Sequence, residues 1–340
     1  MTSQTAETLE FDNSPVPIID ISPYFTGDPA KKAEVARQID HACRNIGFLV
    51  ISGHGVADEI VARTYDTTRT FFDLPLDTKF KYEMTAKDIY RGFSRMESSA
   101  LAYTIGERDM LPDHREMYVI NRHDIDWNDP YFACEQGRRI FPPNVYPEEL
   151  PEMKPVLESY YDTMTGLATT LMRLFALALN LEEDFFDDKV DKHMTNFVLS
   201  DYPDQPEELP PGQMRAGAHT DYGSLTILRT EDKPGGLEVR TRDGRWAPVP
   251  IVPGTFIINI GDLMAQWTND QWISTMHRVV NPPRDKAGSS RRISLIFFHQ
   301  PNYDARIECL PSCVGNGAHY SPTTSGEHLL AKMIQANDVG

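Results

Sequence analysis

The sequence has few cysteines and no long run of apolar residues. Its 340 residues include only Cys43, Cys134, Cys309 and Cys313, and no histidine cluster accompanies them, so a disulfide framework or a structural zinc site is not indicated. Scattered thiols of this kind are typical of a reducing cytoplasm, which is the location we predict. No stretch approaches 18 uninterrupted apolar residues, and Met1–Asn13 lacks the basic start and apolar centre of a signal peptide.

Positive charge is also scarce. The chain has 33 Lys and Arg against 50 Asp and Glu, which gives a formal net charge of −17. This balance argues against nucleic acid or an anionic membrane as the main partner, and we expect a small-molecule substrate instead. A hydrophobic fraction of 40% and an aromatic fraction of 10% are ordinary for a globular protein, so collagen-like, disordered and coiled-coil classes are excluded.

The pattern of apolar residues and turn signals changes along the chain. Before about residue 194 it predicts helices around short strands, and afterwards many short strands with turn residues between them, which indicates a barrel or sandwich. The expected strands cover 16–21, 47–51, 197–202, 217–230, 236–241, 246–249, 255–260, 278–281 and 292–300. The expected helices cover roughly 30–45, 58–73, 152–181 and 326–336. The fold class we predict is therefore mainly β with flanking helices.

One histidine and one aspartate stand two residues apart in the segment around residue 220. On a strand, His219 and Asp221 would project to the same face and offer an imidazole and a carboxylate to one point. His277, which opens a later β-run, is the natural third ligand. Two histidines and one carboxylate leave three positions of an octahedral metal open, which is the ligand set of non-haem Fe(II) oxygenases. Taken alone, such a triplet is weak evidence for a metal and is more often an ordinary strand end.

A later strand combines an arginine and a serine on one face. Arg292 and Ser294 would offer a guanidinium fork and a hydroxyl, which together suit a carboxylate. Ile296 and Phe298 continue that face, so the pocket beyond the anion would be apolar. The alternative is that Arg292 pairs with an internal acid and is purely structural. Arg291 is the second choice for the anion, although it points to the other face.

Several segments together resemble the isopenicillin N synthase-like family of Fe(II)/2-oxoglutarate-dependent dioxygenases. The resemblance covers nearly the whole chain. Its motifs are 16–20, Gly47-Phe48, Gly53-His54-Gly55, Asp201-Tyr202-Pro203, His219-x-Asp221, Asn259-x-Gly261-Asp262, His277-Arg278-Val279 and Arg292-x-Ser294. It implies a double-stranded β-helix, or jelly roll, in one compact unit. Residues 1–120 would form an N-terminal region, 121–193 a linker and scaffold helix, 194–305 the jelly-roll core, and 306–340 a segment closing the site.

The resemblance also implies the cofactors and their ligands. His219, Asp221 and His277 match the Fe(II) ligands, while Arg292 and Ser294 match the residues that bind the far carboxylate of 2-oxoglutarate. Tyr202 matches a tyrosine that often bonds the same co-substrate, or is a core tyrosine. The implied enzyme consumes O₂, uses ascorbate as a reductant in vitro, and releases succinate and CO₂. It would hydroxylate, desaturate or cyclise a small molecule.

Finer similarities concern the substrate. The segments 90–93, 97–98 and 287–291 are similar to deacetoxycephalosporin C synthase, but 197–201 lack the arginines that bind the β-lactam in that enzyme. We therefore expect a role in specialised or antibiotic metabolism without penicillin ring expansion. The candidate substrate contacts are Arg91, Phe93, Arg115, Ile296 and Phe298. The motifs leave the substrate and the oligomeric state open.

Three other readings use the same residues. The chain could be a 2-oxoglutarate-independent Fe(II) oxidase of the isopenicillin N synthase type, which shares the iron ligands and the Arg-x-Ser segment. It could be a zinc hydrolase with His219, Asp221 and His277 as ligands, which would work without O₂. It could also be a jelly-roll binding module, although such a module has no physical need for all three ligands.

Overall fold

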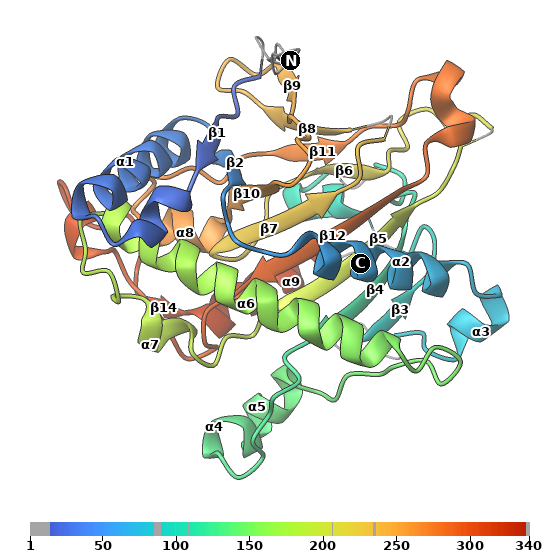
Figure 1. Cartoon of the computed structure of the whole chain (residues 1–340), viewed down its shortest axis with the longest axis horizontal. Coiled ribbons are helices and arrows are strands. Elements are labelled where there is room, and N and C mark those ends of the chain that lie inside the picture. Colours follow the sequence, from blue (N-terminus) through green and yellow to red (C-terminus); the bar gives the residue numbers. More distant parts are fainter. Residues whose placement is uncertain are drawn as a thin grey trace, which may run out of the picture.

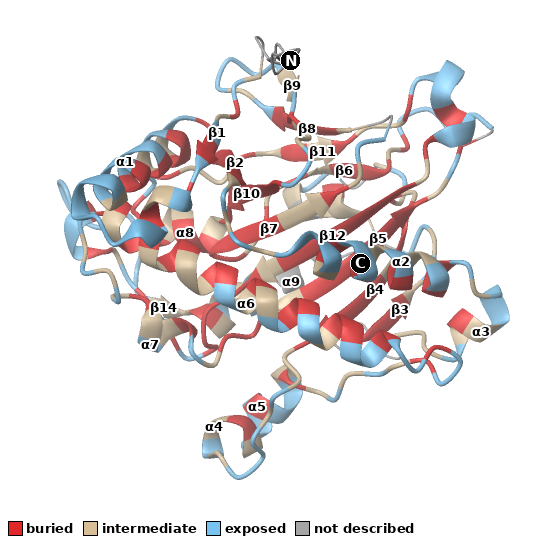
Figure 2. Cartoon of the chain, viewed as in Figure 1, coloured by how far each residue is buried: buried red, intermediate tan, exposed pale blue. Residues whose placement is uncertain are grey.

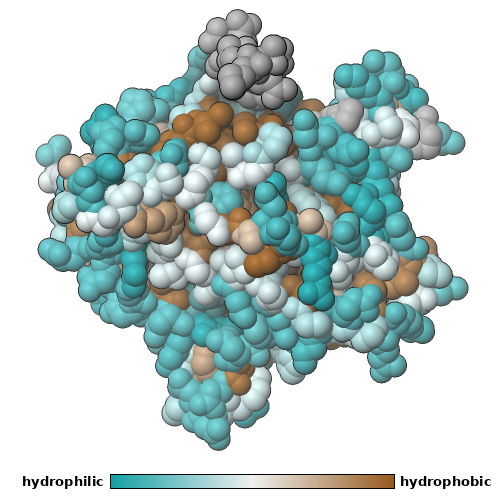
Figure 3. Space-filling view, in the orientation of Figure 1, coloured by the Kyte–Doolittle hydropathy of each residue, from teal (hydrophilic) through white to brown (hydrophobic). Residues whose placement is uncertain are grey.

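The computed structural model describes residues 14–84, 90–98, 100–107, 109–205, 207–233 and 236–337. Two β-sheets lie at its centre, and helices cover the outer face of the larger one (Figure 1). Within the described ranges, no helix is both long and apolar enough to cross a membrane. The face seen in Figure 3 is largely hydrophilic, with smaller apolar patches between the polar side chains.

The larger sheet has eight strands and the smaller one four. In spatial order, the large sheet contains β1 (Ile18–Asp20), β2 (Phe48–Ser52), β10 (Phe256–Ile260), β7 (Leu225–Thr230), β12 (Arg292–His299), β5 (Asn196–Tyr202), β4 (Glu116–Asn121) and β3 (Gly92–Ser94). The small sheet contains β6 (Ala216–His219), β11 (His277–Val279), β8 (Leu237–Arg240) and β9 (Trp246–Pro248). A separate pair joins β13 (Arg306–Ile307) to β14 (Thr323–Thr324). All neighbours are antiparallel except β1 and β2.

The long helices stack against one another on the large sheet. The α-helices are α1 (Pro29–Asn45), α2 (Asp58–Phe72), α3 (Leu76–Phe80), α4 (Pro130–Ala133), α5 (Glu135–Ile140), α6 (Met153–Ala178), α7 (Asp187–Val190), α8 (Asp262–Trp267) and α9 (Ser325–Asn337). Short 3-10 helices are η1 (Ser22–Thr26), η2 (Leu101–Ile105), η3 (Arg284–Ser289) and η4 (Pro311–Cys313). The Asp28 carboxylate accepts from the Ala30 amide and caps α1, with Pro29 in the first turn, as the sequence predicts.

The two faces of the large sheet pack differently because side chains alternate along each strand. On β12, Ile293, Leu295 and Phe297 join the main apolar core together with α1, α2 and α6. The other face, toward the small sheet, carries Arg292, Ser294 and a small separate apolar cluster. Figure 2 shows the strands of the large sheet as almost entirely buried. The polar residues on this second face are therefore enclosed between the two sheets.

The elements follow the sequence prediction with two clear departures. The expected strand 217–230 is interrupted, because β6 ends at His219 and β7 begins only at Leu225. Asp221 therefore lies in a loop, and the alternation along one strand that we used to pair it with His219 is wrong. The edge strand β3, its neighbour β4 and the short helix α8 were not predicted.

Candidate metal centre

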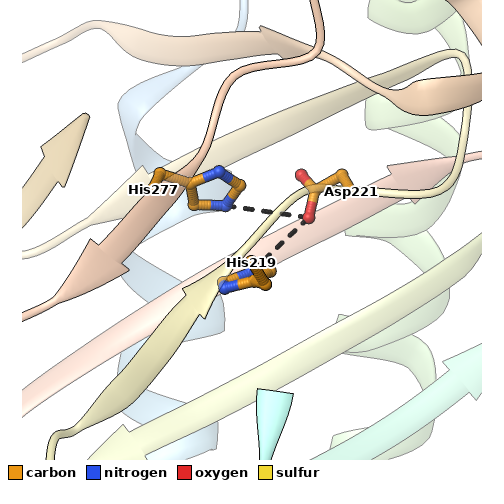
Figure 4. A group of neighbouring side chains, drawn as sticks. All are labelled: His219, Asp221 and His277. Atoms are coloured by element: carbon orange, nitrogen blue, oxygen red, sulfur yellow. Dashed lines mark ion pairs between the residues drawn. The ribbon is translucent and has the colours of Figure 1, made fainter. Parts of the chain in front are cut away.

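The two histidines are brought together by strand pairing in the small sheet. His219 is the last residue of β6 and His277 the first of β11, and the antiparallel register places them directly opposite each other. Their ring centroids are 4.2 Å apart. The loop after β6 then turns the Asp221 side chain back toward both rings, as Figure 4 shows.

The three side chains present one donor atom each to a common point. The Nε2 atoms of His219 and His277 each lie 3.7 Å from the Asp221 Oδ1 oxygen. All three donors lie within 4.8 Å of one another, and all three residues are buried. This spacing and this mixture of imidazole and carboxylate fit a single first-row metal ion with several of its positions left free.

The far side of each side chain is held by a hydrogen bond. His219 Nδ1 lies 2.8 Å from the Gly217 carbonyl oxygen, and His277 Nδ1 lies 3.0 Å from the Thr275 carbonyl oxygen. A proton on each Nδ1 leaves the Nε2 lone pairs free for a metal. The Asp221 Oδ2 oxygen accepts from Asn259 Nδ2 at 2.7 Å and Thr226 Oγ1 at 2.5 Å. Only Oδ1 of Asp221 therefore remains available for coordination.

The local electrostatics favour the protonation states that bind metal. Burial and the neighbouring His277 lower the pKa of His219, so its imidazole is neutral at physiological pH. Burial opposes ionisation of Asp221, but His277, His219 and the hydrogen bonds from Asn259 and Thr226 together lower its pKa. A neutral imidazole and an ionised carboxylate are the forms that bind a cation.

Two glycines let the Asp221 loop approach the neighbouring chain closely. A Cβ atom at Gly261 would lie 2.2 Å from the Gly223 carbonyl oxygen, so no larger residue fits there without a backbone shift. The next amide, that of Asp262, donates to the Asp221 carbonyl oxygen at 2.7 Å. These contacts fix the loop at the start of α8.

A second polar site lies on the same side of the large sheet. Arg292 is 1% exposed, and among the described residues nothing pairs with its buried Nε and Nη1 atoms. Its guanidinium carbon lies 5.1 Å from the ring centroid of Tyr202, the residue opposite it on β5. Ser294 is also buried, and its hydroxyl lies 2.9 Å from that of Thr230. Unpaired guanidinium donors beside a hydroxyl form a receptor for a carboxylate.

The structure excludes the alternative arginine for this pocket. Arg291 points to the other face of the sheet, where its Nε lies 3.1 Å from Asp201 Oδ1 and its Nη1 lies 2.6 Å from Asp73 Oδ1. Arg292 thus has unused donors, while Arg291 already has two carboxylate partners.

Two of the predicted substrate contacts lie outside the site. Phe93 is fully buried in the outer core, where its ring packs against Phe71 and Phe80, because β3 turns this side chain away from the small sheet. Arg91 donates to the backbone carbonyls of Tyr90 and Ile140 and to Asn196 Oδ1. Arg91 therefore joins neighbouring segments of chain, and we drop both residues as substrate contacts.

Two other candidates, Ile296 and Phe298, meet on the inner face of the large sheet. Ile296 lies in the small apolar cluster, and Phe298 packs against that cluster. Arg115, one residue before β4, is buried beside Asp113. Sequence reasoning missed the supporting roles of Thr226, Asp113 and Asn259. The conspicuous Asn259-x-Gly261-Asp262 motif could have signalled Asn259, but no local pattern marks the other two.

Comparison with known proteins identifies the same chemistry. Residues 16–149 match the N-terminal model of the non-haem dioxygenases in morphine synthesis, and residues 192–301 match the 2OG-Fe(II) oxygenase superfamily. Homoarginine-6-hydroxylase 2-ODD-233 of Oryza sativa subsp. japonica is 34% identical, covering 95% of this chain and 98% of that protein. Validamycin A dioxygenase of Streptomyces hygroscopicus subsp. limoneus is 32% identical, covering 94% and 86%.

A solved structure shows the same architecture. A full-length Neurospora crassa protein, crystallised in complex with alpha-KG, which is 2-oxoglutarate, superimposes with a TM-score of 0.81 at 31% identity. The match covers 94% of this chain and 95% of that one. These findings confirm the jelly-roll core, the oxygenase class and the use of Fe(II) and 2-oxoglutarate expected from the resemblance. The chain belongs to the 2OG-Fe(II) oxygenase superfamily.

Proposed function

We propose that His219, Asp221 and His277 bind the Fe(II) ion and that Arg292 and Ser294 anchor 2-oxoglutarate. The observation that carries this proposal is that three buried side chains present metal-ligand atoms to one point, and the two histidines are oriented by hydrogen bonds to backbone carbonyls. The same side of the large sheet holds a buried arginine whose N–H groups lack partners among the described residues. In this arrangement the guanidinium of Arg292 takes the far carboxylate of the co-substrate, and the hydroxyl of Ser294 adds a second bond. The co-substrate would then extend from β12 toward the metal.

The Tyr202 ring has a packing role in this proposal. It lies against the guanidinium groups of Arg292 and Arg215, with ring-to-carbon distances of 5.1 Å and 5.9 Å. An aromatic face stabilises a buried cation, so Tyr202 keeps Arg292 in place whether or not its hydroxyl reaches the co-substrate.

Bound iron and 2-oxoglutarate supply the oxidation itself, in which O₂ is consumed and 2-oxoglutarate is decarboxylated to succinate and CO₂. The side chains of this protein orient the co-substrate, hold Asp221 ionised and keep bulk water away from the reacting atoms. The position of the substrate relative to the metal then determines whether the product is hydroxylated, desaturated or cyclised.

We propose a small molecule of specialised metabolism as the substrate. The relatives support a small substrate: two are named for homoarginine and validamycin A, and the Neurospora crassa protein was also solved with thymine. The net charge of −17 supports a protein that does not work on nucleic acid or an anionic membrane. Four unpaired cysteines support a cytoplasmic location.

We further propose that the C-terminal segment, 306–340, closes the site over the core formed by 194–305. Lys332 of α9 lies 2.6 Å from Asp262 Oδ2, and the same oxygen accepts from Thr220 Oγ1 at 3.1 Å. Thr220 stands between the proposed ligands His219 and Asp221. The last helix is thereby tied to the metal loop. The remaining boundaries of the division, 1–120 and 121–193, stay predictions.

The central test is succinate formation from 2-oxoglutarate by the purified protein with Fe(II) and ascorbate, in air and under nitrogen. We expect succinate only in air and only with Fe(II), and no succinate from His219→Ala. Product formation without any 2-oxo acid would favour the oxidase of the isopenicillin N synthase type. Activity that persists under nitrogen with Zn²⁺ would favour a hydrolase.

A further inference from the structure

One buried arginine between the two sheets has no assigned role in iron or co-substrate binding. Arg115 is only 7% exposed and precedes β4 by one residue. Its guanidinium lies 3.4 Å from Asp113, whose carboxylate accepts from the Gly217 amide of β6, so the side chain faces the small sheet. Met117 packs against the apolar cluster that includes Val198 and Ile296. Arg115 therefore lies on the inner side of the large sheet, two residues before Met117 in the chain.

The hydrogen-bonding capacity of Arg115 is almost unused. Its Nη2 atom lies 3.4 Å from Asp113 Oδ2, and among the described residues no other carboxylate is within ion-pair distance. Its buried Nε has no partner within the same residues. A guanidinium carries five N–H donors, and a buried donor without an acceptor destabilises the folded protein. The site thus lacks an acceptor that a ligand would supply.

Asp113 is already engaged by the backbone. Its Oδ1 accepts from the Gly217 amide at 2.8 Å and its Oδ2 from the Leu101 amide at 3.2 Å. These bonds attach the carboxylate to β6 and η2, so it cannot turn to meet the guanidinium squarely. The Asp113 charge offsets that of Arg115 without satisfying its donors.

Arg115 is also close to the proposed iron ligands. Asp113 binds Gly217, which is two residues before His219 on β6. A group held by Arg115 would therefore be attached to the same strand end that presents the metal ligand.

The side chains that follow Arg115 on the inner face of the sheet indicate the chemistry of the rest of the ligand. Met117 and Phe298 are half-buried although they lie on the inner face of the sheet, so they border space that solvent reaches. Val198 and Ile296 beside them are buried and apolar. A ligand held at Arg115 thus meets an apolar wall next to its polar end.

We propose that Arg115 binds a carboxylate of the substrate, so that the enzyme acts on small carboxylic acids with an apolar body. The planar fork of a guanidinium matches the two oxygens of a carboxylate, whereas a neutral amide offers only one acceptor. The apolar body would pack against Val198, Ile296 and Phe298. This inference rests on the proposed function, because it assumes that oxidation occurs beside His219.

The test compares acids with their neutral counterparts. The enzyme loaded with Fe(II) and 2-oxoglutarate is kept under nitrogen, and its thermal unfolding is followed with butanoate, hexanoate, octanoate and phenylacetate, each against its primary amide. We expect at least one acid to raise the midpoint, with an apparent Kd at least tenfold lower than that of its amide. In air, the same acid should increase 2-oxoglutarate consumption.

Variants of Arg115 show whether the stabilisation by acids arises at this residue. Arg115→Gln should lose the stabilisation by the acid, and Arg115→Lys should keep part of it, which also controls for folding. Arg37→Gln, an exposed arginine of α1 that pairs with Glu34, serves as the matched control and should respond like the parent. Equal shifts with acid and amide, no shift with any acid, or an Arg115→Gln protein that still responds would each overturn the proposal. Failure of the proposed function would show separately, as no succinate from the parent enzyme.

Discussion

At the scale of single residues, the Asp221 carboxylate has two different tasks. One oxygen faces the two imidazoles, and the other accepts hydrogen bonds from Asn259 and Thr226. Those bonds lower the pKa of Asp221 and also fix the rotation of the carboxylate. If Asp221 binds the metal as proposed, these two side chains would influence metal affinity without touching the ion.

The first prediction concerns Asn259. Replacing it by alanine removes a hydrogen bond from Asp221 Oδ2 while leaving the three proposed ligands in place, so Fe(II) affinity should fall about 10- to 100-fold. The affinity is measured by titrating the metal-free protein with Fe(II) under nitrogen. The control is Asn45→Ala, at the exposed end of α1, which should bind iron like the parent. An unchanged affinity for Asn259→Ala would show that Thr226 alone suffices.

The second prediction uses the neighbouring arginines of β12. Arg292→Met should raise the half-saturating concentration of 2-oxoglutarate about thirtyfold or more, since losing one partner of a desolvated charge pair costs about 2–5 kcal/mol. Arg291→Met should leave that concentration unchanged but lower the free energy of unfolding, because Asp201 then stays buried without its cation. Steady-state kinetics and urea unfolding separate the two effects. A kinetic effect at Arg291 only would refute the assignment of the pocket.

At the scale of elements, the position of α9 matters most. It contacts η2, and its Lys332 reaches across to Asp262 at the start of α8. This ion pair is half-buried, so it is less screened by solvent than a pair on the open surface. The last helix thereby contacts η2, which packs against β6, and α8, which begins beside the loop that holds Asp221.

The third prediction follows from this contact. Lys332→Met should loosen α9 and expose the site to water, so 2-oxoglutarate consumption without substrate should rise relative to coupled turnover. Amide hydrogen exchange in 325–332 should be faster by up to about fivefold, the equivalent of losing about 1 kcal/mol. Lys31→Met, on an exposed position of α1, is the matched control. Exchange in 325–332 that matches the parent would mean that apolar contacts alone hold α9.

At the scale of the whole molecule, two buried histidines on the outer face of the large sheet connect stability to pH. The rings of His193 and His299 lie 5.5 Å apart, and both residues are almost fully buried. Burial lowers the pKa of His299 to about 3, and burial together with His299 lowers the pKa of His193 well below its usual value. Both rings are therefore neutral in the folded protein.

The fourth prediction is that acid destabilises the protein well above the range in which carboxylates titrate. The unfolded chain binds protons at both histidines below about pH 6.5 while the folded protein does not, so each contributes a loss of up to about 1.4 kcal/mol per pH unit as the pH falls. Urea unfolding between pH 8 and pH 5 measures this slope. His193→Gln should reduce this slope by the contribution of one proton, which is up to about 1.4 kcal/mol per pH unit. A slope that does not change in this variant would contradict the assignment.

Residue identity and order already determined much of this protein. The proposed ligands His219, Asp221 and His277 and the proposed anchors Arg292 and Ser294 could be named from the sequence, because metal and carboxylate binding demand those residue types. The long helices α1 and α6 also follow from the chain, since capping at Asp28 and apolar periodicity act over a few neighbouring residues.

The tertiary structure alone decided which way the remaining side chains face. Phe93 and Arg291 lie on the outer side of the large sheet, whereas Arg115 and Arg292 lie between the sheets. A shift of one residue reverses the face of every side chain on a strand, and the pairing of distant strands sets that register. Asp221 meets the histidines through a loop held by Gly261 and Asn259, because those contacts come from parts of the chain nearly 40 residues away and no local pattern contains them.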